Sequence, residues 1–176
     1  MDKLSVTEYF TLPETSRPME LDHGVVREPP MPAWGHQLIS ARLTALLYEH
    51  VEQLGLGQVS SPVDVVLDAE TALVVQPDIV FVSTARLGIV RERVWGAPDL
   101  VVEIQSPRTA QRDRIVKLAW YRQYGVRECW LVDPAARTVE VIDLPSTTPG
   151  RLFAGATPLR SYVLPHWPHS PDRIFA

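Results

Sequence analysis

The stretch APDLVVEIQSP, residues 97–107, decides the fold class, because it reads as a buried strand that carries one acid, Glu103, in its interior. In a strand, alternate residues share a face, so Leu100 and Val102 point one way and Glu103 points the other. We therefore expect one face of this strand to be core and the other to be polar. A buried carboxylate must be paired, hydrogen-bonded, protonated or bound to a cation, because an uncompensated ion costs several kcal/mol. Glu103 thus needs a partner.

Short segments rich in Val and Ile surround this strand and predict a sheet. Further strands are expected in QVSSPVDVVLD and in ALVVQPDIVFVS. MELDHGVVREPP predicts a hairpin that turns at Asp22-His23-Gly24, and RECWLVD with TVEVIDL predicts a second one. The strands and helices together indicate a layered α/β or α+β domain with a mixed sheet.

Helix signals are strongest from His36 to Leu54, where apolar residues recur at helical spacing and Gly55 follows as a C-cap. His36 itself is expected to cap or pack at the start of this helix. A second helix is expected from about Thr109 to Tyr124, where a glycine follows. SVTEYFTL has capping-box spacing and predicts a short N-terminal helix that a proline at position 13 ends.

The composition is that of an ordinary globular protein, with 45% hydrophobic and 22% charged residues among 176. This length suits one domain over residues 1–176, with the N-terminal helix and the proline-rich C-terminal tail packed on it. The apolar runs are short, and the N-terminus lacks the pattern of a signal peptide, so we expect a cytoplasmic protein. The single cysteine, Cys129, excludes an intramolecular disulfide and is expected to fill the core.

Charge is distributed unevenly along the chain. The net charge is −4, yet nine Lys and Arg face only four acids between Thr84 and Arg127. Such a segment suits either a local phosphate-binding field or a solvated helix face. The sequence alone leaves both interpretations open.

A second acid, Asp78, lies at the start of the preceding strand, directly after Pro77. If the two strands are antiparallel neighbours, the start of the first lies opposite the end of the second, which brings Asp78 to Glu103 and Gln105. Two neighbouring carboxylates repel unless a cation lies between them, and oxygen ligands suit Mg²⁺ or Mn²⁺. Asp99 lies about 13 Å along the strand from Glu103, so we expect it to have a structural role.

The helix after this strand adds a basic and aromatic face. Asp113, Lys117 and Tyr121 are spaced four residues apart and share one side of the expected helix. Lys117 is therefore expected to lean over Glu103. Gln105, on the same strand face, is expected to fix the Glu103 carboxylate or to hydrogen-bond a metal-bound water.

These residues, taken in order, resemble a known family. The matching pieces are ELDHG, QPDIVFV, GAPDLVVEIQSP, the stretch from Asp113 to Tyr121, YGVRECWLVDP and VEV, which run from Met19 to Leu144. The chain thus resembles the bacterial Uma-type restriction endonucleases, a branch of the PD-(D/E)XK nuclease superfamily. The resemblance implies a restriction-endonuclease-like core with a mixed β-sheet flanked by helices. It also implies hydrolysis of phosphodiester bonds in DNA with Mg²⁺, or Mn²⁺, as cofactor.

The resemblance further implies roles for individual residues. Asp78 and Glu103 correspond to the metal ligands, and Lys117 corresponds to the catalytic lysine, moved from the strand to the helix. Superfamily members usually carry Glu-x-Lys within one strand, whereas this chain has Gln105 at the third position. Glu20, in the first hairpin, resembles an additional acid of the family. The chemistry needs such groups, because a metal polarises the phosphate and acidifies water while a lysine offsets charge in the transition state.

Other functions fit the same residues. Glu103 and Lys117 could form an ion pair without a metal, which would suit a non-catalytic module that binds DNA or protein and retains the nuclease fold. A third interpretation is a structural protein that forms dimers and carries its acids at the surface. The expected partners are therefore DNA, with a second copy of the chain as a further candidate, and no membrane.

Overall fold

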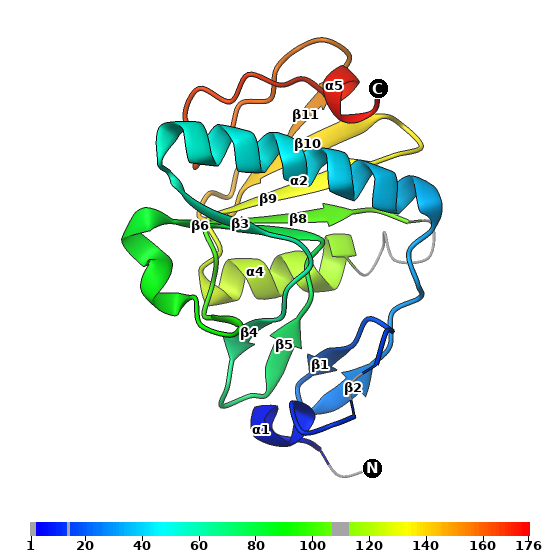
Figure 1. Cartoon of the computed structure of the whole chain (residues 1–176), viewed down its shortest axis with the longest axis vertical. Coiled ribbons are helices and arrows are strands. Elements are labelled where there is room, and N and C mark those ends of the chain that lie inside the picture. Colours follow the sequence, from blue (N-terminus) through cyan, green and yellow to red (C-terminus); the bar gives the residue numbers. More distant parts are fainter. Residues whose placement is uncertain (1–2, 14, 107–112) are drawn as a thin grey trace.

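The chain folds into two β-sheets that are flanked by helices (Figure 1). The computed structural model describes residues 3–13, 15–106 and 113–176, without the side chains of residues 113 and 114. The architecture is mixed α+β, as the sequence predicts, but the strands form two sheets rather than one. None of the described helices is both long and apolar enough to cross a membrane.

The larger sheet has six strands in the order β11-β10-β9-β8-β6-β3. They are β3 (Gly57–Ser60), β6 (Ile79–Ser83), β8 (Leu100–Ile104), β9 (Glu128–Asp133), β10 (Thr138–Asp143) and β11 (Arg151–Ala154). β8 and β9 are parallel and the other neighbours are antiparallel, so the sheet is mixed. The predicted hairpin of β9 and β10 is confirmed.

Helices lie on both faces of the larger sheet (Figure 1). On one face, α2 (Trp34–Leu54) buries Leu47 in an apolar cluster that includes Val102 of β8. On the other face, α4 (Leu118–Tyr124) packs in a second cluster with Val101. The two faces of β8 are therefore both part of the core.

This burial corrects one prediction for β8. All five of its residues are buried, so the expectation that one face of the strand is polar is wrong. A strand in the middle of a sheet that is covered on both faces is apolar on both, and its side chains do not alternate in polarity. Glu103, only 4% exposed, is thus an acid inside the core.

The smaller sheet has the strand order β2-β1-β5-β4-β7. Its strands are β1 (Glu20–Asp22), β2 (Val25–Arg27), β4 (Val65–Asp68), β5 (Leu73–Val75) and β7 (Val94–Trp95). The predicted hairpin of β1 and β2 is confirmed. Val65 and Val75 of this sheet share an apolar cluster with Val80 of the larger sheet, so the two sheets have a continuous core.

Two of the predicted strands divide between the sheets. QVSSPVDVVLD forms β3 and β4, and ALVVQPDIVFVS forms β5 and β6. Each division falls close to a proline, Pro62 or Pro77, which lacks the N–H group that a central strand requires. The second division places Asp78 at the junction of the two sheets, immediately before β6.

Helix boundaries are close to those predicted. α2 begins at Trp34, slightly earlier than expected, and ends as predicted with Gly55 in the left-handed conformation at φ 62°. α1 (Val6–Tyr9) has the predicted capping box, but it ends well before Pro13. A 3₁₀ helix, η1 (Thr84–Ile89), follows β6.

The helix predicted from Thr109 begins outside the described residues. Its described part opens with a π-helical turn, η2 (Asp113–Lys117), continues as α4 and ends at Gly125, as predicted. π-helical turns shift the phase of the side chains around them and are frequent at functional sites. This one ends at Lys117.

The C-terminal segment contains two elements that the sequence analysis does not resolve, β11 and α5 (Pro171–Ile174). A buried acid, Glu128, holds this segment against β9. Its carboxylate accepts hydrogen bonds from Trp130 Nε1 and Ser161 Oγ, each at 2.6 Å, and from the backbone N–H of Tyr162. Burial raises the pKa of Glu128 even though these hydrogen bonds act in the opposite direction.

Candidate active site

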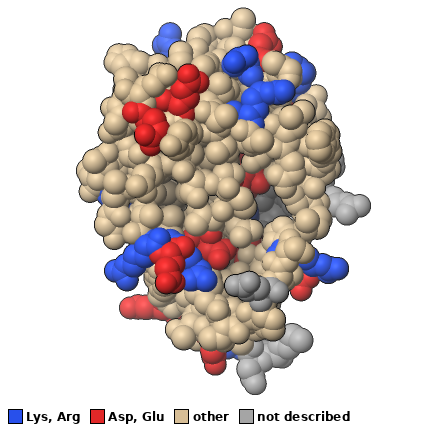
Figure 2. All heavy atoms as spheres, in the orientation of Figure 1, with Lys and Arg blue, Asp and Glu red and all other residues tan. Residues whose placement is uncertain are grey.

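A cavity of about 960 Å³ opens between the N-terminal half of α2 and the junction of the two sheets. Figure 2, in the orientation of Figure 1, shows a hollow near the middle of the molecule, with acidic side chains inside it. Titratable side chains from five separate segments line the cavity, among them Glu20, His36, Asp78, Glu103 and Lys117. A concave site with convergent charged groups is the first place to look for a function.

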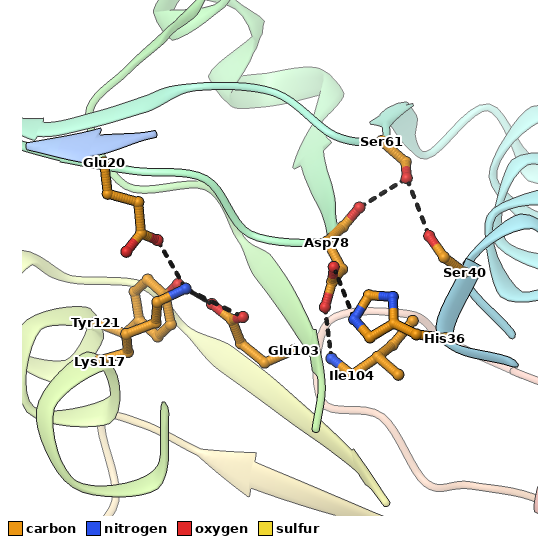
Figure 3. A network of polar contacts seen from close by, with 9 residues as sticks. All are labelled: Glu20, His36, Ser40, Ser61, Asp78, Glu103, Ile104, Lys117 and Tyr121. Carbon is orange, nitrogen blue, oxygen red and sulfur yellow. Dashed lines mark hydrogen bonds and ion pairs between the residues drawn. The ribbon is translucent and has the colours of Figure 1, made fainter. Parts of the chain in front are cut away.

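Lys117 lies at the centre of a buried charged network (Figure 3). Its Nζ is 2.8 Å from Glu20 Oε1 and 3.0 and 3.3 Å from the two carboxylate oxygens of Glu103. The side chains of Glu20, Glu103 and Lys117 are only 2%, 5% and 6% exposed. Charges this deep are tolerated because each has an opposite charge in contact with it.

Tyr121 completes the environment of Glu103. Its hydroxyl donates a short hydrogen bond to Glu103 Oε1. Burial raises the pKa of the Tyr121 phenol well above its ordinary value, and the charge of Glu103 raises it further. The phenol therefore keeps its proton at physiological pH and remains a donor. Together with Lys117 it fixes the orientation of the Glu103 carboxylate.

Asp78 has a different set of contacts beside this network (Figure 3). Its Oδ2 accepts a hydrogen bond of 2.7 Å from the backbone N–H of Ile104, and its Oδ1 is 3.3 Å from His36 Nε2. Its backbone carbonyl accepts a hydrogen bond of 2.7 Å from Ser61 Oγ. The Asp78 side chain is 23% exposed, so it is more accessible from the cavity than Glu103.

The antiparallel pairing predicted for Asp78 and Glu103 is confirmed at the level of the backbone. Ile79 of β6 pairs with Val102 of β8, so Asp78 and Glu103 occupy the next position of the register. Figure 3 shows that the two carboxylates turn in different directions, Glu103 toward Lys117 and Asp78 toward the start of α2. The two acids thus line one cavity but have separate nearest partners.

The donor groups fit a hard divalent cation. In the part of the chain that the structure describes, no three His, Cys, Asp or Glu side chains are grouped so as to hold a metal ion by themselves. Mg²⁺ does not need such a cage, because it keeps several waters and is commonly bound by one or two carboxylates together with a substrate phosphate. Asp78 and Glu103 can supply these carboxylate oxygens.

Gln105 and Asp113 are further residues that the sequence predicts for this site. β8 ends at Ile104. The backbone N–H of the next residue, Gln105, still donates a hydrogen bond of 2.8 Å to the carbonyl of Val132 in β9. Its neighbours Ile104 and Ser106 are among the described residues that line the cavity, whereas Gln105 is not. Asp113 begins η2, and its side chain lies outside the described residues.

His36 lies in the cavity wall, although its sequence position indicates only the start of a helix. Its side chain is 14% exposed and contacts Asp78. The helical pattern contained a signal, because His36 lies three and seven residues before the buried residues Ile39 and Leu43, which is the spacing of one helix face. What the pattern could not reveal is that α2 begins beside the start of β6.

Asp99 lies at the opposite end of β8 and has contacts that suit the predicted structural role. It is fully buried and accepts hydrogen bonds from Ser83 N–H at 2.7 Å, Arg127 at 3.0 Å and Arg86 at 3.3 Å. Burial by itself would raise the pKa of Asp99, but these donors together hold it below its ordinary value. Two arginines of the basic segment are therefore engaged away from the cavity.

The fold is one that a nuclease-like protein shares. It matches a crystal structure described as "a putative nuclease belonging to DUF820" from Anabaena variabilis ATCC 29413, with a TM-score of 0.81. The match covers 98% of this chain and 97% of that chain at 20% sequence identity, so it shows a common fold. No curated protein matches this chain significantly.

The model of the Uma2 family, described as "Putative restriction endonuclease", matches residues 6–167. This chain therefore belongs to that family. The resemblance seen in the sequence is confirmed, and so is the expected fold class.

Proposed function

We propose that this protein is an endonuclease that hydrolyses phosphodiester bonds in DNA with bound Mg²⁺ or Mn²⁺. The observation that carries this proposal is the presence of Lys117, Glu103 and Asp78 in the wall of one cavity. Membership of a restriction endonuclease family supports a nuclease, and the carboxylate donors support a hard cation.

The residues of the cavity have distinct roles in this proposal. When bound by Asp78 and Glu103, the metal would polarise the scissile phosphate and lower the pKa of a bound water. Lys117 orients Glu103 and offsets the negative charge that develops on the phosphate. Tyr121 donates to Glu103 and limits its movement, and Glu20 holds the Lys117 amine in place. A buried set of oriented groups needs little reorganisation during the reaction.

Plasmid cleavage tests the proposal. The purified protein should nick supercoiled DNA with Mg²⁺ or Mn²⁺ and should be inactive in EDTA. Asp78→Asn and Glu103→Gln are each expected to lower the rate by at least about 100-fold, the usual effect of removing one preorganised group. Glu52→Gln, which changes an exposed acid near the end of α2, is the matched control and should remain active. Cleavage that survives both cavity substitutions would refute the proposal.

One observation favours a second candidate, a binding module that retains the nuclease fold without catalysis. Both carboxylate oxygens of Glu103 already accept hydrogen bonds from Lys117, so the acid is compensated without a metal. Calorimetric titration with Mn²⁺ separates the two candidates. Binding that Asp78→Asn abolishes would exclude the module, whereas no Mn²⁺ binding in the wild type would exclude the metal-dependent nuclease.

A further inference from the structure

Two of the groups proposed to act on the phosphate lie deep in the cavity. The Glu103 and Lys117 side chains are 5% and 6% exposed. Double-stranded DNA is a stiff rod with a persistence length of about 50 nm, so it cannot bend into a cavity of about 960 Å³. That volume is near the upper limit of the range of about 300–1,000 Å³ for small-ligand pockets, which leaves room for a nucleotide of a flexible strand. Enzymes that modify a base in such a pocket act on an unpaired or flipped-out nucleotide, and a strand that enters this cavity would likewise have to be unpaired.

Two exposed apolar side chains lie at the cavity or next to it in the sequence. Trp34, the first residue of α2, is 84% exposed, and Met31 in the preceding proline-rich segment is 61% exposed. Ala41 lines the cavity, and at about 100° per residue its side chain projects within about 20° of Trp34 along the helix. Trp34 is not itself among the described residues that line the cavity, but it directly follows the lining residue Ala33 and therefore lies beside the cavity. An exposed aromatic ring beside a site for a phosphate is a stacking platform for a base.

The charges of the lining also disfavour a duplex. Proteins that bind duplex DNA rely on several Lys and Arg contacts to phosphates. Among the described residues that line the cavity, the basic side chains are Arg17 and Lys117. Lys117 forms ion pairs with the buried acids Glu20 and Glu103. The Arg17 side chain, by contrast, is 71% exposed. The described part of this wall has three acids and one exposed cation, so it holds a strand by stacking more readily than by phosphate contacts.

Building on the proposed function, we propose that this site takes single-stranded DNA, and that Trp34 stacks on a base of the strand whose backbone enters the cavity. The geometry assigns Trp34 as a residue that selects unpaired over paired DNA. It takes no part in the hydrolysis itself.

Binding measured without metal tests this inference separately from catalysis. Fluorescence anisotropy in EDTA would compare a short labelled single strand with the duplex of the same sequence. The single strand is expected to bind at least about tenfold more tightly. Trp34→Ala should weaken single-strand binding by roughly 5- to 150-fold, since stacking contributes about 1–3 kcal/mol per base. Trp34→Phe retains an aromatic ring and should keep most of the affinity.

Tyr48→Ala is the matched control, because Tyr48 is an aromatic residue of the same helix, 56% exposed and more than three turns away from Trp34. It should not change the affinity. Equal or tighter binding of the duplex, or equal effects of Trp34→Ala and Tyr48→Ala, would overturn the inference.

Cleavage assays distinguish this failure from that of the proposed function. Metal-dependent cleavage of duplex DNA without preference for single strands would overturn the inference and leave the nuclease intact. Single-strand binding that depends on Trp34, without cleavage of any DNA, would leave the strand site intact and overturn the nuclease.

Discussion

Replacing Lys117 by methionine is expected to destabilise the fold by about 3–5 kcal/mol, the cost of removing one partner from a buried ion pair. Methionine is similar in length but lacks the ammonium that lies 2.8 Å from Glu20 and 3.0 Å from Glu103. The side chains of these acids are 2% and 5% exposed, so little solvent surrounds them once the ammonium is gone. An exposed ion pair contributes at most about 1 kcal/mol. The expected loss is a large part of the total stability of about 5–15 kcal/mol.

The two acids provide an internal test of this magnitude. In the Lys117→Met background, Glu20→Gln removes one acid that has lost its contact with the ammonium, and the further change Glu103→Gln removes the other. Stability should recover stepwise, because replacing all members of a buried charged cluster by neutral groups is often close to neutral. Urea denaturation followed by circular dichroism gives the free energy of unfolding of each variant, and a double-mutant cycle gives the coupling.

A matched control comes from an exposed pair. Arg17 and Glu28 lie 3.5 Å apart with side chains 71% and 56% exposed, so Arg17→Met should have little effect on stability. The reasoning would be refuted if Lys117→Met cost less than about 1 kcal/mol, the value for an exposed pair. It would also be refuted if Glu20→Gln restored no stability in the Lys117→Met background.

Three other predictions concern the scaffold. The pKa of Asp99 lies below its ordinary value, so its ionised form stabilises the fold above about pH 4, and this stabilisation is lost as the pH falls further. In Asp99→Asn the melting temperature should therefore fall less steeply as the pH is lowered below about 4. An unchanged pH dependence would contradict the role of the donors to Asp99. In Gly57→Ala the new Cβ would lie 2.1 Å from the Val82 carbonyl oxygen, so urea denaturation should show a loss of about 3 kcal/mol. Gly88→Ala, which meets no atom within 4 Å, should change stability by less than about 1 kcal/mol, and similar losses in both variants would contradict the clash. We also propose that residues 1–176 form one domain, because one apolar cluster joins both sheets. Circular dichroism and tryptophan fluorescence should then give coincident unfolding transitions. Two separate transitions would mean that the chain contains two units that unfold independently.

Local patterns predicted much of the secondary structure. The helical spacing that ends at Gly55 and the two hairpins appear in the structure as expected. Caps, turns and periodicity are set by neighbouring residues, which is why they can be read from one sequence. The predicted strands that contain Pro62 and Pro77 each form two strands instead of one, because whether a strand continues past a proline depends on the sheet that receives the next residues.

The prediction of the candidate site depended on the prediction that the two strands pair. Two acids in consecutive antiparallel strands, followed by a helix with Lys117, were enough to bring Asp78, Glu103 and Lys117 to one region. His36 was assigned only to a helix start, since its contact with Asp78 joins residues distant in sequence. Gln105 shares a strand face with Glu103 only if the strand continues, and β8 ends before it.

The sequence by itself determined that Glu103 is an acid inside an apolar segment, and it predicted that Asp78 would lie opposite Glu103 and that a lysine would follow on a helix. The tertiary structure decided which partner each carboxylate takes. Glu103 turns to Lys117 and Tyr121, and Asp78 turns to the N-terminal end of α2. The physical reason is that strand periodicity specifies the face on which a side chain starts, whereas its final direction depends on the donors that distant segments place around it.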